Sequence, residues 1–364
     1  MAGTSRSARR RWWSSALALA GMLVAFGLAP AVSARSTPAD PASAADRPAL
    51  QAPTTVRAAL FSSVSDAGVY VAQEKGYFAE QGLSVEDSTF TTTSDILVAM
   101  AGGQIEVGGV PISAGFFNAY ARGAIVRLVS DKGSLEPGHG YQGIVVRQDL
   151  VDTIRGPADL RGRRMAITDR GISTEVAVAR YVERAGLTIN DVDLVTMGFG
   201  DAVAGLGNRG LDAAMSIEPI MTSLGDQGIA QVLVRNDEII PNQQNAVLAF
   251  SDPFARNEDA ARRFTIAYLR GVRLYNDAFS RNDPAARADV VGILTRRTTV
   301  TNPELYDRMA MPGLHPDGAI NVDSLRNDSA YFLSMGQQTA QVDVGATVDG
   351  SFVQYAAQQL GPYR

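Results

Sequence analysis

Few side chains in this sequence could carry out covalent or metal chemistry. The 364 residues include no cysteine and only two histidines, His139 and His315. This scarcity removes most metal sites of the histidine or cysteine type and any cysteine nucleophile. The glycine and serine motifs of serine hydrolases, P-loop enzymes and dinucleotide-binding enzymes do not occur either. We therefore expect no catalytic residue, no metal and no cofactor.

Hydroxyl side chains recur where a predicted strand ends and a helix begins. In open α/β sheets, ligands bind beyond the carboxyl ends of the strands, beside helix N-termini. Each hydroxyl also has an ordinary alternative role as the cap of its helix. Their convergence on one predicted edge favours ligand binding by some of them. The hydroxyl candidates selected in this way are Ser62, Ser63, Ser65, Thr92, Ser94, Ser113, Ser173, Thr174 and Ser216, and Ile112 is added because it lies in the same loop as Ser113.

The segment from Gly171 to Thr174 is the preferred anion-binding segment. Free N–H groups at a helix N-terminus attract negative charge, and a glycine lets the backbone approach a ligand closely. Arg170 either adds positive charge there or is a solvated surface residue. Glu218 contacts a ligand amine, pairs with an arginine, or merely precedes a helix that starts at Pro219.

A glycine-rich segment at residues 131–142 adds further candidates. Tyr141 could stack on a ligand ring, and Lys132 or His139 could meet an anion. The alternative is a flexible connector between two halves of the protein. Glu106 and Asp212, each beside a glycine-rich turn, are expected to orient those turns rather than to bind a ligand.

An alternating pattern of strands and helices supplies the elements that position these residues. Predicted strands cover residues 56–61, 83–86, 105–110 and 125–129, and the pattern restarts with strands at 164–168, 193–197 and 211–216. This order predicts an α/β fold with two lobes, each a mostly parallel sheet flanked by helices, and a ligand cleft between them. Residues 245–250 are predicted to return between the lobes and to pair with residues 143–147. Two such crossings form a hinge.

The predicted boundaries follow from these patterns and from the first residues. Arg6, Arg9, Arg10 and Arg11 precede an apolar run at residues 12–28 and a small-residue sequence ending at Ala34, which is typical of a cleaved secretory signal. An uncleaved anchor is the alternative, and the choice between general and twin-arginine export stays open. The predicted division is a signal at 1–34, a disordered spacer at 35–54, the first lobe at 55–147, the second lobe at 148–243, and a return strand with helices on the first lobe at 244–364.

The amino-acid composition limits the class of protein and the cellular compartment in which it works. Removing the four signal arginines changes the formal net charge from −5 to −9, which argues against nucleic-acid binding. Without cysteine there is neither a disulfide framework nor a lipid-acceptor residue. We therefore expect a monomer that is freely soluble in the periplasm.

Five motifs, in order along the chain, resemble those of the nitrate/sulfonate/taurine-type and thiamine-precursor-type binding proteins of ABC transporters. They are Gly76-Tyr77-Phe78 with Gly82-Leu83, Gly102-Gly103-Gln104-Ile105-Glu106, Asp159-Leu160-Arg161-Gly162, Asp212-Ala213 with Glu218-Pro219, and the closing stretch from Val348 to Gly361. The resemblance implies a type II periplasmic-binding-protein fold and ABC permease subunits as partners. Glu106 stands where the family usually has Asp.

The ligand implied by these residues is a small organic anion, sulfonate- or carboxylate-like, captured by lobe closure. A heteroaromatic pyrimidine is the alternative, favoured by Tyr141 and Glu218. Two other classes stay open: an enzyme similar to thiamine-pyrimidine synthases, and a ligand-sensing module for a membrane receptor. The enzyme fits poorly because Lys75 lies beside a helix end and histidines are scarce.

Overall fold

The computed structural model describes residues 53–124 and 126–364 of the chain. The predicted signal at residues 1–34 and nearly all of the predicted spacer at 35–54 lie outside these residues. None of the described helices is long and apolar enough to span a bilayer.

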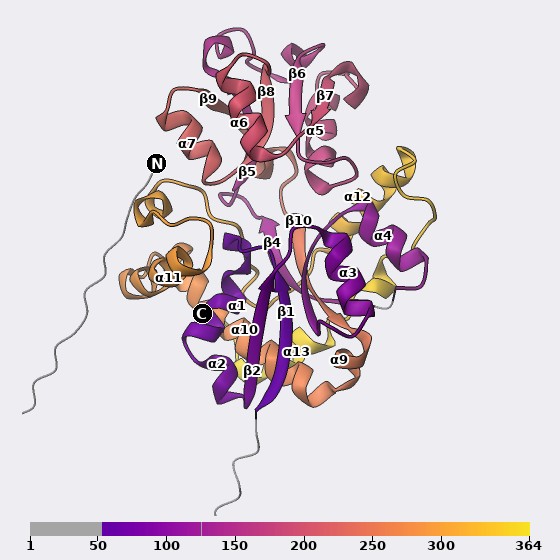
Figure 1. Ribbon diagram of the computed structural model, residues 1–364, viewed down its shortest axis with the longest axis vertical. Helices are drawn as coiled ribbons and strands as arrows, with labels where there is room; N and C mark the ends of the chain where they lie inside the picture. The colour runs from indigo at the N-terminus through magenta and orange to yellow at the C-terminus, as the bar shows by residue number, and fades with distance from the viewer. Residues whose placement is uncertain (1–52, 125) are drawn as a thin grey trace, which may run out of the picture. The chain divides into compact units, whose positions relative to one another are not determined.

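Two five-stranded sheets organise the described chain (Figure 1). The first has the order β2-β1-β3-β10-β4, and the second has the order β7-β6-β8-β5-β9. The strands of the first sheet are β1 (Thr54–Leu60), β2 (Leu83–Thr89), β3 (Val107–Pro111), β4 (Val126–Leu135) and β10 (Gln243–Ser251). Those of the second are β5 (Gln142–Arg147), β6 (Arg164–Ile167), β7 (Asp193–Thr196), β8 (Ala213–Ile217) and β9 (Ala230–Arg235).

The two sheets follow the same plan. In the first, β10 runs antiparallel to β3 and β4, whereas β1 is parallel to β2 and β3. In the second, β5 runs antiparallel to β8 and β9, whereas β6 is parallel to β7 and β8. In each sheet a single strand therefore opposes the other four. This arrangement confirms the predicted fold of two lobes with mostly parallel sheets.

The predicted pairing of residues 245–250 with residues 143–147 is wrong. Strand β10 lies between β3 and β4 of the first sheet, and β5 lies between β8 and β9 of the second. Each of these strands finds hydrogen-bond partners on both edges within one sheet, which a two-stranded link between the lobes would not provide. The chain therefore enters the second sheet at Gln142, before the predicted boundary at residue 147.

Helices cover both sheets. Those of the N-terminal part are α1 (Ala67–Glu74), α2 (Tyr77–Glu80), α3 (Thr93–Ala101) and α4 (Ala114–Ala121). The second sheet carries α5 (Ser173–Glu183), α6 (Phe199–Gly207) and α7 (Ile220–Asp226), followed by α8 (Asn236–Ile239). The C-terminal part forms α9 (Asp252–Arg256), α10 (Glu258–Phe279), α11 (Pro284–Arg297), α12 (Val322–Ser334) and α13 (Ser351–Leu360).

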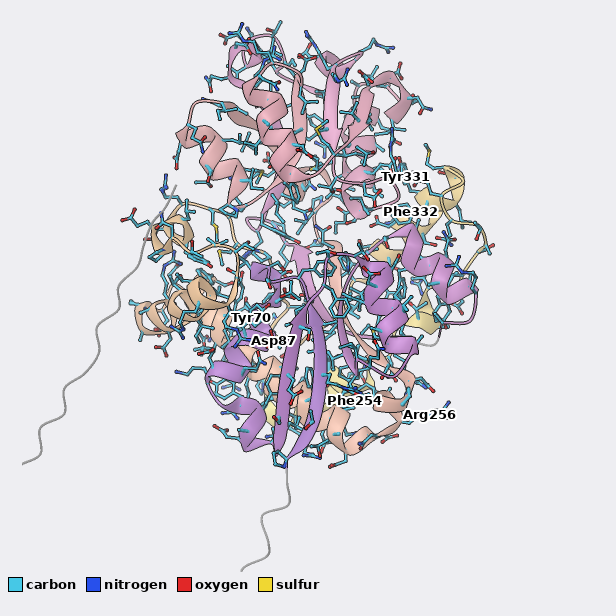
Figure 2. All side chains as sticks on the ribbon, in the orientation of Figure 1. Tyr70, Asp87, Phe254, Arg256, Tyr331 and Phe332 are labelled. Atoms are coloured by element: carbon cyan, nitrogen blue, oxygen red, sulfur yellow. The ribbon has the colours of Figure 1, made fainter. Side chains whose placement is uncertain are left out.

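Helix α10 is the central helix of the first lobe. It packs on α1, α11 and α13. The approach to α1 is close: a Cβ atom at Gly271 would lie 2.2 Å from the carbonyl oxygen of Gly68. An aromatic cluster fixes α9 and α10 to β10, with the Phe254 ring (Figure 2) edge-on to Phe250 at 5.0 Å and to Phe264 at 6.1 Å.

Candidate functional site

Two of the predicted ligand loops meet at the boundary between the lobes. The loop after β3 contains Ile112 and Ser113, and the loop after β6 contains Gly171 and Ser173. The N–H of Ala114 donates to the carbonyl oxygen of Gly171 at 2.7 Å, and the N–H of Ser173 donates to that of Ile112 at 3.3 Å. The N-termini of α4 and α5 are therefore brought together across the lobe boundary.

The preferred anion-binding segment is occupied by a carboxylate of the chain itself. Gly171 has a φ of 68°, and its N–H donates to Glu175 at 2.6 Å. The other carboxylate oxygen of Glu175 accepts from the Arg170 guanidinium at 2.9 Å, and the Glu175 side chain is fully buried. Thr174 keeps a buried hydroxyl oxygen that has no partner among the described residues.

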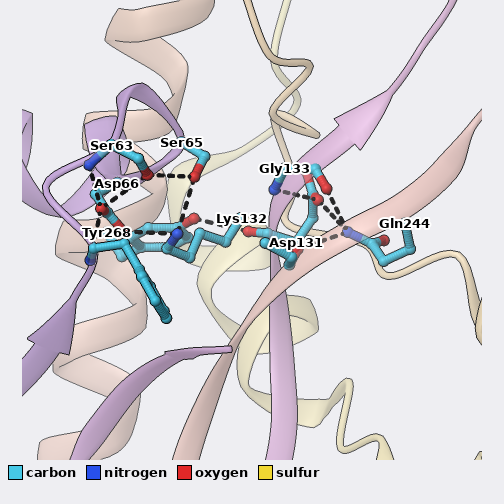
Figure 3. A network of polar contacts seen from close by, with 10 residues as sticks. Ser63, Ser65, Asp66, Asp131, Lys132, Gly133, Gln244 and Tyr268 are labelled. Atoms are coloured by element: carbon cyan, nitrogen blue, oxygen red, sulfur yellow. Dashed lines mark hydrogen bonds and ion pairs between the residues drawn. The ribbon is translucent and has the colours of Figure 1, made fainter. Parts of the chain in front are cut away.

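The hydroxyl cluster after β1 is built around Asp66 (Figure 3). Asp66 accepts from the N–H of Ser63 at 2.9 Å and from its hydroxyl at 3.0 Å. The hydroxyls of Ser63 and Ser65 lie 2.8 Å apart. Ser62, in the left-handed region at φ 54°, instead contacts the Thr89 hydroxyl at 2.7 Å. Ser63 and Ser65 thus belong to one network, and Ser62 lies at its edge.

Lys132 closes this network from the neighbouring part of the sheet. Its ammonium lies 2.7 Å from an Asp66 oxygen and donates to the Ser65 hydroxyl at 3.0 Å, with only 1% of the residue exposed (Figure 3). The side chain lies over Gly109, where a Cβ atom would be 2.5 Å from the lysine Cε. A buried ammonium needs such a paired, hydrogen-bonded environment.

The flexible-connector interpretation of residues 131–142 is wrong for its first part. Residues 131–135 belong to β4, and Asp131, Lys132 and Ser134 are all buried. From the sequence alone these polar residues suggested an exposed loop, because the partners that let them be buried lie far away along the chain. Asp131, for example, accepts from the N–H groups of Gly133 at 2.9 Å and His315 at 2.6 Å. Burial raises the pKa of the Asp131 carboxyl to about 6, although these hydrogen bonds act to lower it.

Tyr141 lies between the two sheets and is buried. Its hydroxyl is 3.4 Å from the Asn245 side-chain nitrogen and 3.4 Å from the position of a Cβ at Gly133. Burial raises the pKa of Tyr141 to about 12, so the phenol stays neutral. Asn245 also accepts from the N–H of Ile112 at 2.9 Å through its backbone, which links Tyr141 to the loop after β3.

Glu218 is paired with an arginine, one of the three roles considered from the sequence. It lies 3.1 Å from the Arg235 guanidinium and accepts from the N–H and hydroxyl of Thr222 at 3.0 and 2.8 Å. Its own N–H donates to the Tyr141 carbonyl at 2.8 Å, so it lies beside the cluster just described. Ser216, two residues earlier, has a buried hydroxyl with no partner among the described residues.

The structure does not bring Thr92 and Ser94 into this region. Thr92 caps α3, accepting from the N–H of Asp95 at 3.1 Å, and it is exposed. Thr92 has the extended backbone that an N-cap needs. Ser94 is an exposed residue of the first turn. Glu106 binds Arg57 and Asp212 lies near Arg147, so both acids hold local structure.

Sequence reasoning missed Asp66, Arg235 and Asn245 as parts of this region. The one available signal was the run Gln243-Gln244-Asn245, three amides that lead into an otherwise apolar strand. Gln244 uses its amide to bind Asp131, the Gly133 carbonyl and the Ala246 carbonyl (Figure 3). Asp66 and Arg235 are the ion-pair partners of Lys132 and Glu218, and a single sequence does not show which charged residues pair.

The electrostatics of the site are those of matched pairs. Three cations near the lobe boundary have carboxylate partners: Lys132 with Asp66, Arg170 with Glu175, and Arg235 with Glu218. In the part of the chain that the structure describes, no three histidine, aspartate or glutamate side chains are placed to hold a metal ion. The region offers hydroxyls, amides and helix N-termini, a set suited to holding a small molecule by hydrogen bonds.

Comparison with known proteins places the chain in a family. The family model described as NMT1/THI5 like matches residues 64–279, more than half of the sequence. The chain belongs to this family. A Brucella abortus protein that bears the provisional name "binding protein" is 23% identical over 196 residues, which are 53% of this chain and 58% of that protein. The chain thus aligns with less than two thirds of that relative.

Solved structures share the fold. A periplasmic aliphatic sulphonate-binding protein from Escherichia coli superimposes with a TM-score of 0.67 and 19% identity, covering 82% of this chain and 92% of that one. A periplasmic nitrate-binding protein from Synechocystis PCC 6803 superimposes with a TM-score of 0.68 and 16% identity, covering 85% of this chain and 89% of that one. A desulfurisation enzyme, DSZB, superimposes with a TM-score of 0.57 and 16% identity, covering 85% of this chain and 100% of that one. These similarities confirm the type of fold expected from the five motifs.

Proposed function

We propose that this chain is the solute-binding component of an ABC-type importer, exported to the periplasm, and that it holds a small organic anion between its lobes. The observation that carries the proposal is the meeting of two helix N-termini at the lobe boundary. The N–H groups of Ala114 and Ser173 bind carbonyl oxygens of the opposite lobe. A ligand that enters between the two loops would replace these carbonyl oxygens as the acceptor for both N–H groups, and would then contact both lobes.

Helix N-termini suit an anion because their N–H groups and dipoles favour negative charge. The three nearby cations already have carboxylate partners, so they supply little net attraction. A monoanion held by neutral donors fits this balance better than a multiply charged ligand. Two proteins of the same fold, one sulphonate-binding and one nitrate-binding, support the same class of ligand.

Binding would act through the population of the closed form. A ligand that contacts both lobes favours closure only by its differential affinity for the closed state. The closed form then docks on the permease subunits, with the protein acting as a monomer. An enzymatic role is disfavoured, although the desulfurisation enzyme shares the fold: a solved variant of that enzyme is named for a cysteine-to-serine change, and this chain has no cysteine.

A ligand screen tests the class. The mature protein is melted in the presence of alkanesulfonates, aromatic carboxylates, nitrate or aminopyrimidines. A ligand at a hundredfold excess over its Kd stabilises by about 2.7 kcal/mol, a clear rise in melting temperature. We expect stabilisation by sulfonates or carboxylates. Stabilisation by pyrimidines alone would show that the ligand class is wrong, and no response to any class would refute the binding role.

A backbone change tests the site. Ala114→Pro removes the N–H at the first position of α4, where proline is compatible with the helix and with the extended backbone of Ser113. Loss of one hydrogen bond to a charged ligand weakens binding by ~10- to 100-fold. The matched control is Thr93→Pro at the first position of α3, after the equally extended Thr92. If Ala114→Pro and Thr93→Pro bind the ligand with equal affinity, the anion does not bind at the N-terminus of α4.

A further inference from the structure

A short segment of the first lobe, residues 307–312, reaches the second lobe. It belongs to the connection between α11 and α12, which passes beside α7 (Figure 1). The Arg308 guanidinium donates to both carboxylate oxygens of Asp226, the last residue of α7, at 2.7 Å each. The N–H of Ala310 lies 3.5 Å from a carboxylate oxygen of Glu218. Two acids of the second lobe therefore meet this one segment of the first.

The same segment is firmly anchored on the first lobe. Met309 and Met311 are each 6% exposed, and they belong to the apolar core that includes α1, α10 and α11. Just beyond the segment, the backbone of Gly313 exchanges two hydrogen bonds with Ser134 of β4, at 2.9 and 3.0 Å. These buried methionines alternate with the two residues that contact the second lobe. The segment should therefore keep its place when the second lobe moves.

The contact with the second lobe is, by contrast, easy to break. The side chains of Arg308 and Asp226 are 48% and 47% exposed, and such exposed ion pairs are weak and screened by salt. The position of the pair still favours contact between the lobes. Asp226 lies at the C-terminal end of α7, where the helix dipole disfavours negative charge and favours a cation. Separation of the lobes removes the cation that compensates Asp226.

We propose that residues 307–312 form an electrostatic strap, anchored on the first lobe, that holds the second lobe through the Arg308–Asp226 pair. The strap sets how often the lobes separate when no ligand is bound. The inference rests on the proposed function, because a ligand enters between the two boundary loops only when they part. The screening length falls from about 30 Å at 0.01 M salt to about 3 Å at 1 M, so added salt should loosen the strap.

Amide hydrogen exchange in the ligand-free protein measures separation of the lobes. The N–H groups of Ala114 and Ser173 donate across the lobe boundary, so both exchange with solvent when the lobes separate. The N–H of Gln148 donates to the Ile229 carbonyl at 2.9 Å within the second lobe and serves as the reference. Arg308→Gln should raise the exchange rates of the two boundary amides by ~2- to 5-fold and leave the reference unchanged. Equal rates in the wild type and this variant would overturn the strap.

Two control variants separate the ion pair from a general effect of losing an arginine. Arg326→Gln removes an exposed pair with Asp323 that lies entirely within α12, and its boundary amides should exchange as in the wild type. Arg308→Asp combined with Asp226→Arg restores the pair with its charges reversed. This double variant should return the boundary amides to wild-type rates. If it exchanges as fast as Arg308→Gln, the ion pair does not hold the lobes together.

The salt response tests the electrostatic part of the proposal. Between 0.01 and 1 M salt, the boundary amides of the wild type should exchange faster relative to the Gln148 reference. Those of Arg308→Gln should change less, because the variant has no Arg308–Asp226 pair to screen. The same salt response in both proteins would assign the screening to other charges and contradict the strap. Because no ligand is present, failure of the strap and failure of the ligand screen are read separately.

Discussion

The buried pair between Lys132 and Asp66 should dominate the stability of the first ligand loop. Its two side chains are 2% and 0% exposed, and the ammonium lies 2.7 Å from the carboxylate. Removing one partner of a buried pair costs about 3–5 kcal/mol, because the other charge remains buried without compensation. The pair ties the loop after β1 to strand β4, so this cost should appear as loss of global stability.

The structure predicts which partner costs more to remove. In Lys132→Met, the Asp66 carboxylate keeps three donors, the N–H of Phe61 and the N–H and hydroxyl of Ser63. That variant should lose about 3 kcal/mol, at the lower end of the range. In Asp66→Asn, the ammonium keeps only neutral acceptors, the Ser65 hydroxyl and the amide oxygen, and the loss should approach about 5 kcal/mol.

Urea unfolding followed by circular dichroism measures both values. The matched control is Lys75→Met, since Lys75 is the other lysine of the chain and its ion pair with Asp289 is exposed. Exposed pairs contribute about 0–1 kcal/mol. If Lys132→Met and Lys75→Met are equally stable, the argument from burial is wrong. If Lys132→Met costs more than Asp66→Asn, the argument from the remaining donors is wrong.

Three other changes give separate tests. Gly109→Ala places a Cβ 2.5 Å from the buried lysine Cε and should cost about 1–3 kcal/mol in urea unfolding; a neutral result would mean that the lysine moves freely. Glu218→Gln breaks the ion pair with Arg235 and should lower stability by about 1–2 kcal/mol at pH 7, with no loss expected if the arginine is already solvated. The Gln337 amide donates to Glu175 at 2.9 Å, and Gln337→Glu replaces it with a second carboxylate that repels Glu175. Small-angle scattering should then show an expanded ligand-free protein. An unchanged radius of gyration would contradict the contact.

The order of elements followed from local patterns in the sequence. Alternating apolar runs and turn residues predicted most of the strands in both sheets. These signals depend on neighbours within a few residues, such as the capping of α4 by Ser113. Two successive βα patterns also predicted two lobes of similar topology. Strand β9 (Ala230–Arg235) was missed, because its exposed polar and apolar residues give no clear period.

The partners of charged and polar residues were decided only by the tertiary structure. The sequence placed Lys132 in a possible loop, whereas the fold buries it beside Asp66, 66 positions earlier, because β4 lies in one sheet with β1. It marked Gly171 as an anion site, whereas α5 turns Glu175 onto that N–H. It paired residues 245–250 with 143–147, whereas each strand joins a different sheet. Hydrogen-bond and ion-pair partners are set by strand order and helix packing, and residues distant in a single sequence carry no local record of either.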